Sequence, residues 1–236
     1  MALVQLASYN FSTVENPLSD GGNFTTISDT AFTNALQVVS GNLCECTTVN
    51  KVGGSYWSGL TWSNDQYSEI TIATSTGGLQ QFIVLVRQGA FNSGTHYVLN
   101  LATSATPSSS KYTLLKYVAN ALTLLISPTT MTVTVGDVWR LSVTGTTLSV
   151  VRNGITLATV SDSSITSGSP GLGIGPATAI TDAQVNLWAG GGVPVGPATQ
   201  YVPYSGAGAE ATIYYPDNHV QDVQYQPNLP INPVRQ

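Results

Sequence analysis

Glu69 is a carboxylate that stands alone on an expected strand, in the alternating segment Ser68-Glu69-Ile70-Thr71-Ile72-Ala73. Glycoside hydrolysis needs two carboxyl groups, about 5–5.5 Å apart for retention or 6.5–9.5 Å for inversion. Asp65 lies in the preceding turn and Glu45 on a different segment, so neither alternates with Glu69 along one strand. The sequence therefore favours a protein that is not an enzyme, with a glycoside hydrolase or polysaccharide lyase as the remaining alternative.

Aromatic residues gather between positions 56 and 67, and amide side chains accompany them: Tyr56, Trp57, Trp62 and Tyr67. An exposed aromatic surface with polar groups at its rim would suit the flat faces of sugar rings. This pattern predicts a carbohydrate-binding site. The alternative is that the two tryptophans pack inside a core, where large aromatic side chains contribute most to stability.

The cysteines and histidines do not form a recognisable metal motif. Cys44 and Cys46 would lie on one side of a strand, roughly 6.5–7 Å apart, which is at the limit for a disulfide. We expect free, buried thiols there. His96 and His219 are isolated in the sequence. Four further oxygen donors are spread over several loops, namely Asp20, Asn23, Asp29 and Asp182. We therefore predict no metal site and no cofactor.

The glycine run at 171–175 has the outline G-x-G-x-G, which in another context would indicate a phosphate-binding loop. Such loops lead into a helix whose N-terminal N–H groups hold the anion. A strand and not a helix is expected after this run. We interpret it as a turn.

Composition limits the classes of protein and partner. Of 236 residues only 8% are charged, while Ser and Thr together number 54. Seven Lys and Arg residues against twelve Asp and Glu give a net charge of −5. Nucleic-acid binding needs clustered cations, so no nucleic-acid partner is expected. The longest strongly apolar stretch, 121–126, is far short of the ~20 residues of a membrane span, so no membrane partner is expected either.

The elements that must position these side chains read as successive strands. Residues 81–87 are almost continuously apolar, and strands are also expected at 96–103 and 111–118. Between 138 and 160 the pattern predicts a three-strand meander. Asn153-Gly154, the pair most favoured in a two-residue type I′ turn, closes its second hairpin. With no convincing helical stripe, this pattern indicates an all-β, two-sheet antiparallel sandwich.

Residues 191–236 differ from the rest of the chain. A Gly- and Pro-rich break at 190–197 precedes a stretch that is rich in Pro and Tyr. Because Pro fixes φ and removes a hydrogen-bond donor, we expect an extended arm and not a second sheet domain. The arm would either wrap its own domain or lie along a partner. The partner-binding prediction rests on five tyrosines: Tyr201, Tyr204, Tyr214, Tyr215 and Tyr225.

Several segments together resemble the concanavalin A-like lectin and glucanase jelly-roll superfamily, and most closely its LamG-like modules. These modules recur in phage structural proteins and bacterial surface proteins. The segments that carry the resemblance are Asn16-Pro17-Leu18-Ser19-Asp20-Gly21-Gly22, Leu36–Asn42, Gln66–Ile70, Gly136–Leu141 with Val151–Gly154, and Ser167–Gly175. The resemblance implies a jelly roll over residues 1–190 and leaves the arm, 191–236, unexplained. It implies little about activity, because function depends on sites grafted onto such folds.

These features together lead to an expected function. The N-terminus lacks a cationic segment and a long apolar segment, so we expect synthesis in the cytoplasm without a Sec signal. The charge-poor composition suits a virion or another extracellular particle surface. We therefore predict a phage virion (capsid decoration) protein, anchored by its arm to copies of itself or to a capsid or scaffold protein. Binding to surface glycans is a further expectation, and a carbohydrate-binding adhesin module is the alternative.

Overall fold

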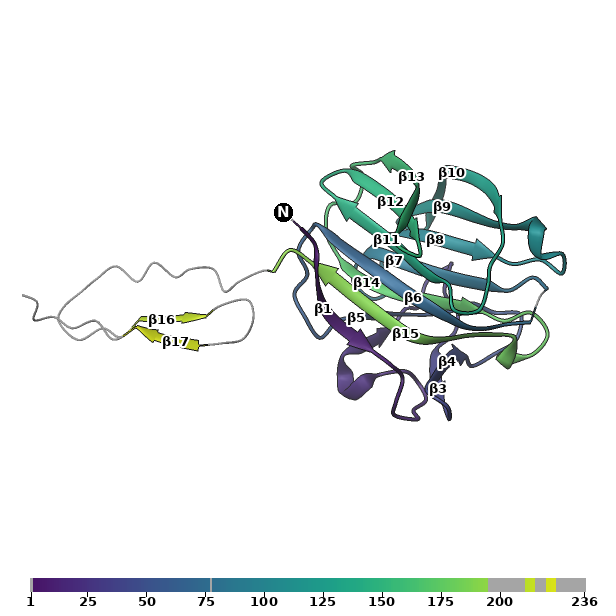
Figure 1. The fold of residues 1–236 in the computed structure, drawn as a ribbon, viewed down its shortest axis with the longest axis horizontal. Helices are drawn as coiled ribbons and strands as arrows, with labels where there is room; N and C mark the ends of the chain where they lie inside the picture. Colours follow the sequence, from purple (N-terminus) through teal and green to yellow (C-terminus); the bar gives the residue numbers. More distant parts are fainter. Residues whose placement is uncertain (1, 77, 195–210, 215–219, 224–236) are drawn as a thin grey trace, which may run out of the picture. The chain divides into compact units, whose positions relative to one another are not determined.

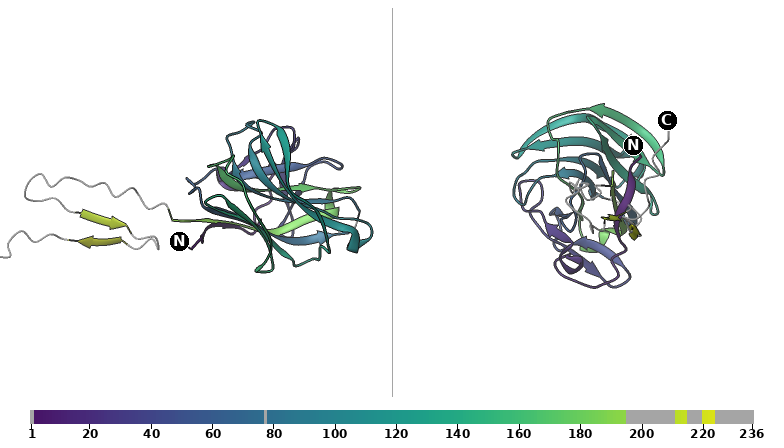
Figure 2. Two further views of the ribbon diagram at one scale, coloured as in Figure 1. Left: turned by 90° about the horizontal axis from the view of Figure 1, so that it is seen from above. Right: turned by 90° about the vertical axis from the view of Figure 1, so that its left-hand side faces the viewer.

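The structure, a computed structural model, describes residues 2–76, 78–194, 211–214 and 220–223. The chain divides into two compact units, residues 1–193 and 194–236. The first unit is built from two antiparallel sheets that pack face to face, which confirms the predicted all-β sandwich (Figures 1 and 2). In the described part of the chain, no helix is long and apolar enough to cross a membrane.

Sheet A has the strand order β13-β12-β11-β6-β15-β4-β3, and β1 also pairs with β15. Its strands are β1 (Val4–Tyr9), β3 (Leu36–Val39), β4 (Leu43–Cys46), β6 (Gln66–Ser75), β11 (Val138–Thr144), β12 (Thr147–Arg152), β13 (Ile155–Ser161) and β15 (Ala183–Gly192). The predicted meander is confirmed as β11, β12 and β13. Asn153 and Gly154 connect β12 to β13 with positive φ angles of 50° and 80°, as a type I′ turn requires.

Sheet B has the strand order β10-β9-β8-β7-β14-β5-β2. Its strands are β2 (Phe24–Thr26), β5 (Gly53–Trp57), β7 (Gln81–Gln88), β8 (His96–Ala102), β9 (Ser110–Val118), β10 (Ala121–Met131) and β14 (Ser169–Gly175). Three short 3-10 helices lie in connections: η1 (Asp20–Gly22), η2 (Pro107–Ser109) and η3 (Ile180–Asp182). The sheet therefore joins two strands from late and early parts of the chain, β14 and β5, to the consecutive strands β7 to β10.

The core lies between the sheets and follows from the alternation of each strand. Along β11, Trp139, Leu141 and Val143 are fully buried, while the residues between them face outward. Trp188 of β15 is also fully buried. Both thiols of β4 belong to this core, so the expected buried cysteines are confirmed. Burial also raises the pKa of the Cys44 thiol well above its usual range, which makes this thiol unreactive.

The interpretation of residues 171–175 as a turn is wrong. They form most of β14, a central strand of sheet B that pairs with β7 on one side and β5 on the other. Leu172 and Ile174 point into the core, whereas the alternating glycines face outward. A Cβ atom on Gly173 would lie 2.6 Å from the ring of Phe32, so the glycines reflect a close approach of another segment and not a chain reversal.

The second unit contains a short hairpin among its described residues. Strands β16 (Ala211–Tyr214) and β17 (Val220–Val223) pair antiparallel, with Ala211 opposite Val223. The sequence predicted no sheet in this stretch. Two short segments of alternating β-favouring residues are enough for local pairing when prolines lie outside them.

Candidate functional site

The outer face of sheet A carries a polar row at the level of Glu69. Register places Glu69 of β6 directly between Arg140 of β11 and Ala189 of β15. Because alternate residues of one strand share a face, Tyr67 lies on the same outer surface as Glu69. The row therefore follows from strand alternation, in which Ile70 and Trp139 point the other way, into the core.

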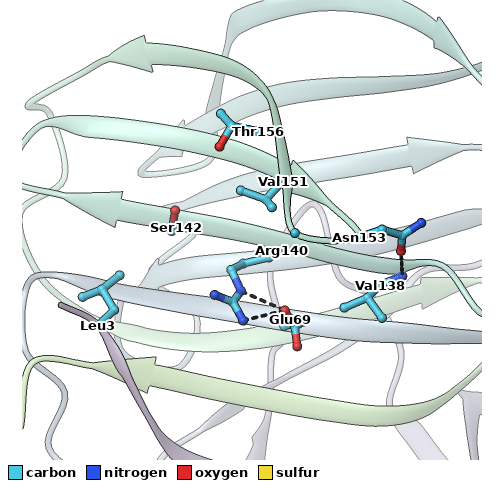
Figure 3. A pocket seen from close by; sticks show the side chains of 9 residues that line it. Leu3, Glu69, Val138, Arg140, Ser142, Val151, Asn153 and Thr156 are labelled. Carbon is cyan, nitrogen blue, oxygen red and sulfur yellow. Dashed lines mark hydrogen bonds and ion pairs between the residues drawn. The ribbon is translucent and has the colours of Figure 1, made fainter.

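Arg140 and Glu69 form an ion pair at the centre of this face. Nε of Arg140 donates to Oε2 of Glu69 at 2.8 Å, and Nη2 lies 2.8 Å from the same oxygen (Figure 3). The guanidinium also lies 4.0 Å from the centre of the Tyr67 ring, within cation–π range. The Arg140 side chain is 37% exposed and the Glu69 side chain 19%. Among the described residues, Oε1 of Glu69 and Nη1 of Arg140 have no hydrogen-bond partner. Both atoms can therefore bind a ligand.

A shallow groove surrounds this ion pair and has a volume of about 430 Å³. Three strands, β6, β11 and β12, form its floor, and Leu3 of the N-terminal segment lies at one end (Figure 3). The lining combines aliphatic side chains with polar ones: Leu3, Val138 and Val151, and Ser142, Asn153 and Thr156. Glu69 is the sole carboxylate among these lining residues, so the groove holds no pair of acids of the kind that cleaves a glycosidic bond.

The turn at Asn153 forms a rigid edge of the groove. Its Oδ1 accepts a hydrogen bond from the Val138 backbone N–H at 2.8 Å, and its Nδ2 donates to Asp137 at 3.0 Å. Arg152 also donates to Asp137, at 2.7 Å. Burial alone would raise the pKa of Asp137, but these hydrogen bonds lower it below its ordinary value. Asp137 therefore stays ionised and holds the turn in place.

The four aromatic residues of the predicted sugar-binding site do not form one exposed surface. Trp57 is buried in the core, where it stacks on Trp188 with ring centres 5.2 Å apart. Trp62 is buried beside it and donates from its indole nitrogen to the Trp57 carbonyl at 3.0 Å. Tyr56 is half-buried on the outer face of sheet B, and Tyr67 is buried under Arg140 on sheet A. Because side chains alternate along β5, Tyr56 and Trp57 point to opposite faces of sheet B. Both Trp57 and Trp62 belong to the core between the sheets.

The predicted partner-binding tyrosines fall mostly outside the described residues. Tyr201, Tyr204, Tyr215 and Tyr225 lie outside them, and the backbone of Tyr214 ends β16. The partner-binding role of all five stays a prediction.

The residues that complete the groove cannot be identified from the sequence alone. Glu69 was singled out from its strand, but Arg140, Ser142 and Asn153 were not connected to it. Alternation around Trp139 predicts that Arg140 faces outward. The missing signal is the pairing of β11 with β6, since Arg140 lies 71 positions after Glu69 in the chain. For metals, the described residues hold no group of three or more His, Cys, Asp and Glu side chains placed as ligands.

Comparisons with known proteins show a likeness of fold. No protein-family model and no curated protein matches the sequence. A carbohydrate-binding module, CBM66 from Bacillus subtilis, superposes with a TM-score of 0.53 and 14% identity, covering 72% of this chain and 94% of that chain. A legume lectin-like domain from Entamoeba histolytica has a TM-score of 0.53 and 13% identity, covering 82% and 100%.

An enzyme is also among the similar structures. SCLam, a non-specific endo-β-1,3(4)-glucanase of family GH16, has a TM-score of 0.53 and 11% identity, covering 80% of this chain and 91% of that chain. Identities this low carry information about fold and not about activity. Binding modules, lectin-like domains and glucanases of this kind share one architecture, and the sandwich described here has it too: the concanavalin A-like jelly roll.

Proposed function

We propose that the sandwich is a carbohydrate-binding module that holds a glycan in the groove on the outer face of sheet A. One observation carries the proposal: an open, polar groove whose central Arg140 and Glu69 each keep an atom free for a ligand. Hydroxyl groups both donate and accept hydrogen bonds, so a sugar can bond to the Glu69 oxygen and the Arg140 nitrogen together. The aliphatic side chains of the lining would contact the C–H faces of the sugar.

The charges of the groove favour an uncharged glycan. Glu69 neutralises Arg140 within the ion pair, so no cation is left to hold a sulfate or carboxylate group. The net charge of −5 for the whole chain also disfavours polyanions. Neutral polysaccharides and oligosaccharides are therefore the expected ligands.

The test is a glycan array with a variant that fills the groove. Thr156 is exposed at the groove wall, so Thr156→Tyr should block it without disturbing the core. Thr123 of β10 is exposed on the other sheet and gives the matched control, Thr123→Tyr. We expect binding by the wild type and by Thr123→Tyr, and loss of at least ten-fold in affinity for Thr156→Tyr. Equal binding by the two variants would place the site elsewhere, and no binding by the wild type would refute the module.

Binding without cleavage is the expected outcome because the groove has one carboxylate. A reducing-sugar assay and an unsaturated-uronate assay, run on the polysaccharides that bind, test this directly. Release of products by the wild type and not by Glu69→Gln would identify a glycan-cleaving enzyme instead.

A second role, display on a particle surface, is supported by the division of the chain at residues 193 and 194. Residues 194–236 make up the second unit and are rich in Pro and Tyr, as an anchoring segment would be. We therefore propose a phage virion or other extracellular particle as its location. Immunogold labelling of native particles tests this proposal, and absence of label from capsids, tails and filaments would refute it.

A further inference from the structure

Residues 27–34 cross the outer face of sheet B and cover an apolar patch there; we call them the strap. Backbone hydrogen bonds hold the strap to the neighbourhood of β5, from Ile27 to the Gly54 carbonyl at 2.9 Å and from Thr33 to the Val52 carbonyl at 3.0 Å. The fully buried ring of Phe32 lies against β5 and β14, where Gly54 and Gly173 leave room for it. A second, small hydrophobic cluster forms underneath, made of Ile27, Phe32, Ile83, Leu85 and Val98.

The seat of the strap also contains a buried pair of titratable side chains. Asp29 of the strap and His96 of β8 both have fully buried side chains, and the Oδ2 of Asp29 lies 3.7 Å from the Nδ1 of His96. This distance is too long for a hydrogen bond. Among the described residues, neither ring nitrogen of His96 nor the Oδ2 of Asp29 has a hydrogen-bond partner.

The surroundings of His96 are otherwise aromatic. The Phe32 ring lies 5.5 Å from the imidazole, and the Tyr117 ring, opposite His96 in the register of β9, lies 4.9 Å away. Asp29 and Tyr117 are therefore the titratable groups that face His96. Burial raises the pKa of Tyr117, with a further contribution from Asp29, so Tyr117 stays neutral in acid and at neutral pH. No ion pair joins Asp29 to a lysine or arginine in the described part of the chain.

The strap is held partly by its own polar contacts and partly by bonds to neighbouring segments. The Asp29 carboxylate binds the backbone of the strap, because its Oδ1 accepts hydrogen bonds from the N–H groups of Ala31 and Phe32 at 2.8 and 2.9 Å. The hydroxyl group of Thr30 donates a hydrogen bond to Oδ1 of Asn120, which precedes β10, at 2.9 Å. The apolar cluster beneath the strap is distinct from the main core between the sheets. Among the described residues, no side chain of the strap belongs to the main core.

We propose that the strap is released by acid: protonation of His96 lifts residues 27–34 from the outer face of sheet B while the two-sheet core stays folded. A protonated imidazole needs an acceptor for each of its two N–H groups. While the strap covers His96, the one acceptor near the ring among the described residues is Oδ2 of Asp29, 3.7 Å away. When the strap lifts, water can accept hydrogen bonds from both ring nitrogens.

The direction of the effect follows from proton linkage. Burial lowers the pKa of His96 from 6.5 to about 4, although Asp29 acts in the opposite direction. The open state, with a solvated imidazole, therefore binds a proton at higher pH than the closed state. The closed strap is fully favoured above pH 6.5 and loses stability as the pH falls from 6.5 towards 4. Between pH 7 and pH 4.5 the opening constant should rise about fifty-fold.

Hydrogen exchange of the full chain, measured by mass spectrometry across this pH range and corrected for intrinsic rates, tests the proposal. The strap amides that donate to backbone carbonyls, those of Ile27, Asp29, Thr33 and Asn34, should lose protection by about fifty-fold at pH 4.5. The amides of β6 and β11 should keep theirs. Unchanged strap protection, or a simultaneous loss over both sheets, would overturn the proposal.

Variants at the two histidines separate His96 from other acid effects. His96→Phe should make strap protection independent of pH, because a phenyl ring packs between Phe32 and Tyr117 and does not titrate. If it does not fold, His96→Gln gives the same comparison with a neutral polar side chain. The matched control His219→Phe should keep the wild-type dependence. If His96→Phe keeps that dependence too, His96 is not the trigger.

Discussion

Arg87 is a buried cation that ties three connections together at one end of the sandwich. Its side chain donates to the carbonyl oxygens of Asn64 at 3.0 Å, Ile165 at 2.6 Å and Gly145 at 2.8 Å. The residue is 2% exposed, and burial lowers the pKa of its guanidinium below the usual range. A guanidinium fork has enough donors for three acceptors in different directions, which an ammonium group on a flexible stem cannot match in the same space.

Arg87→Lys should therefore lower the free energy of unfolding by about 2–4 kcal/mol. The matched control is Arg140→Lys, at an exposed ion pair whose loss costs below about 1 kcal/mol. Urea unfolding followed by tryptophan fluorescence measures both. Equal destabilisation by the two variants would contradict the structural role given to Arg87.

Asp162 gives the sandwich a second acid-sensitive contact. Lys116 Nζ lies 2.6 Å from its Oδ2, and the Tyr97 hydroxyl donates to its Oδ1 at 2.7 Å. Burial would raise the pKa of Asp162, but these hydrogen bonds hold it well below 3.8. Its contribution to stability is therefore present above pH 3.8 and is lost as the pH falls below that value.

Asp162→Asn should cost about 1–3 kcal/mol at pH 7, and the gap to the wild type should close below pH 4. Thermal unfolding at a series of pH values measures this gap. This pH range lies below the range from 6.5 to 4 in which His96 acts, so the two acid effects can be distinguished. A gap that stays constant from pH 7 to pH 2 would show that the charge of Asp162 is not what matters.

At the scale of the elements, the outward-facing glycines of β14 leave the space in which the strap packs against sheet B. A Cβ on Gly173 would lie 2.6 Å from the Phe32 ring and 3.0 Å from the Gly53 carbonyl oxygen, so both neighbours would have to move. Gly173→Ala should lower the free energy of unfolding by about 1–3 kcal/mol. On the same strand, Gly175→Ala meets its first neighbour at 3.2 Å and should cost less. Urea titration of both variants measures the difference, and the reverse order would refute the tight seat.

How far the sequence predicts these elements depends on whether a strand shows its own periodicity. The meander from 138 to 160 was predicted because Trp139, Leu141 and Val143 alternate and Asn153-Gly154 marks its turn. Strand β14 was missed because its outward positions are glycines, whose role depends on the ring of Phe32, about 140 residues earlier in the chain. The groove was missed for a related reason, since Glu69 and Arg140 meet only through the pairing of β6 with β11.

At the scale of the whole molecule, the two units have separable roles in our proposals. The main core and the cluster under the strap both lie within residues 1–193, so the sandwich has a hydrophobic core of its own. A protein cut after Val193 should therefore keep the unfolding midpoint of the full chain within about 2 °C, because a loss under 0.5 kcal/mol shifts the midpoint by that much at this size.

The same truncation should abolish assembly if residues 194–236 are the anchor. Sedimentation velocity of the full and truncated chains, at equal concentrations, compares their association, and the glycan array tests the groove in both. We expect a truncated monomer that still binds glycans, because the groove residues all lie in the sandwich. A truncated protein that assembles as the full chain does would remove the anchoring role and leave glycan binding standing. Loss of binding with assembly intact would instead remove the groove from the proposed function.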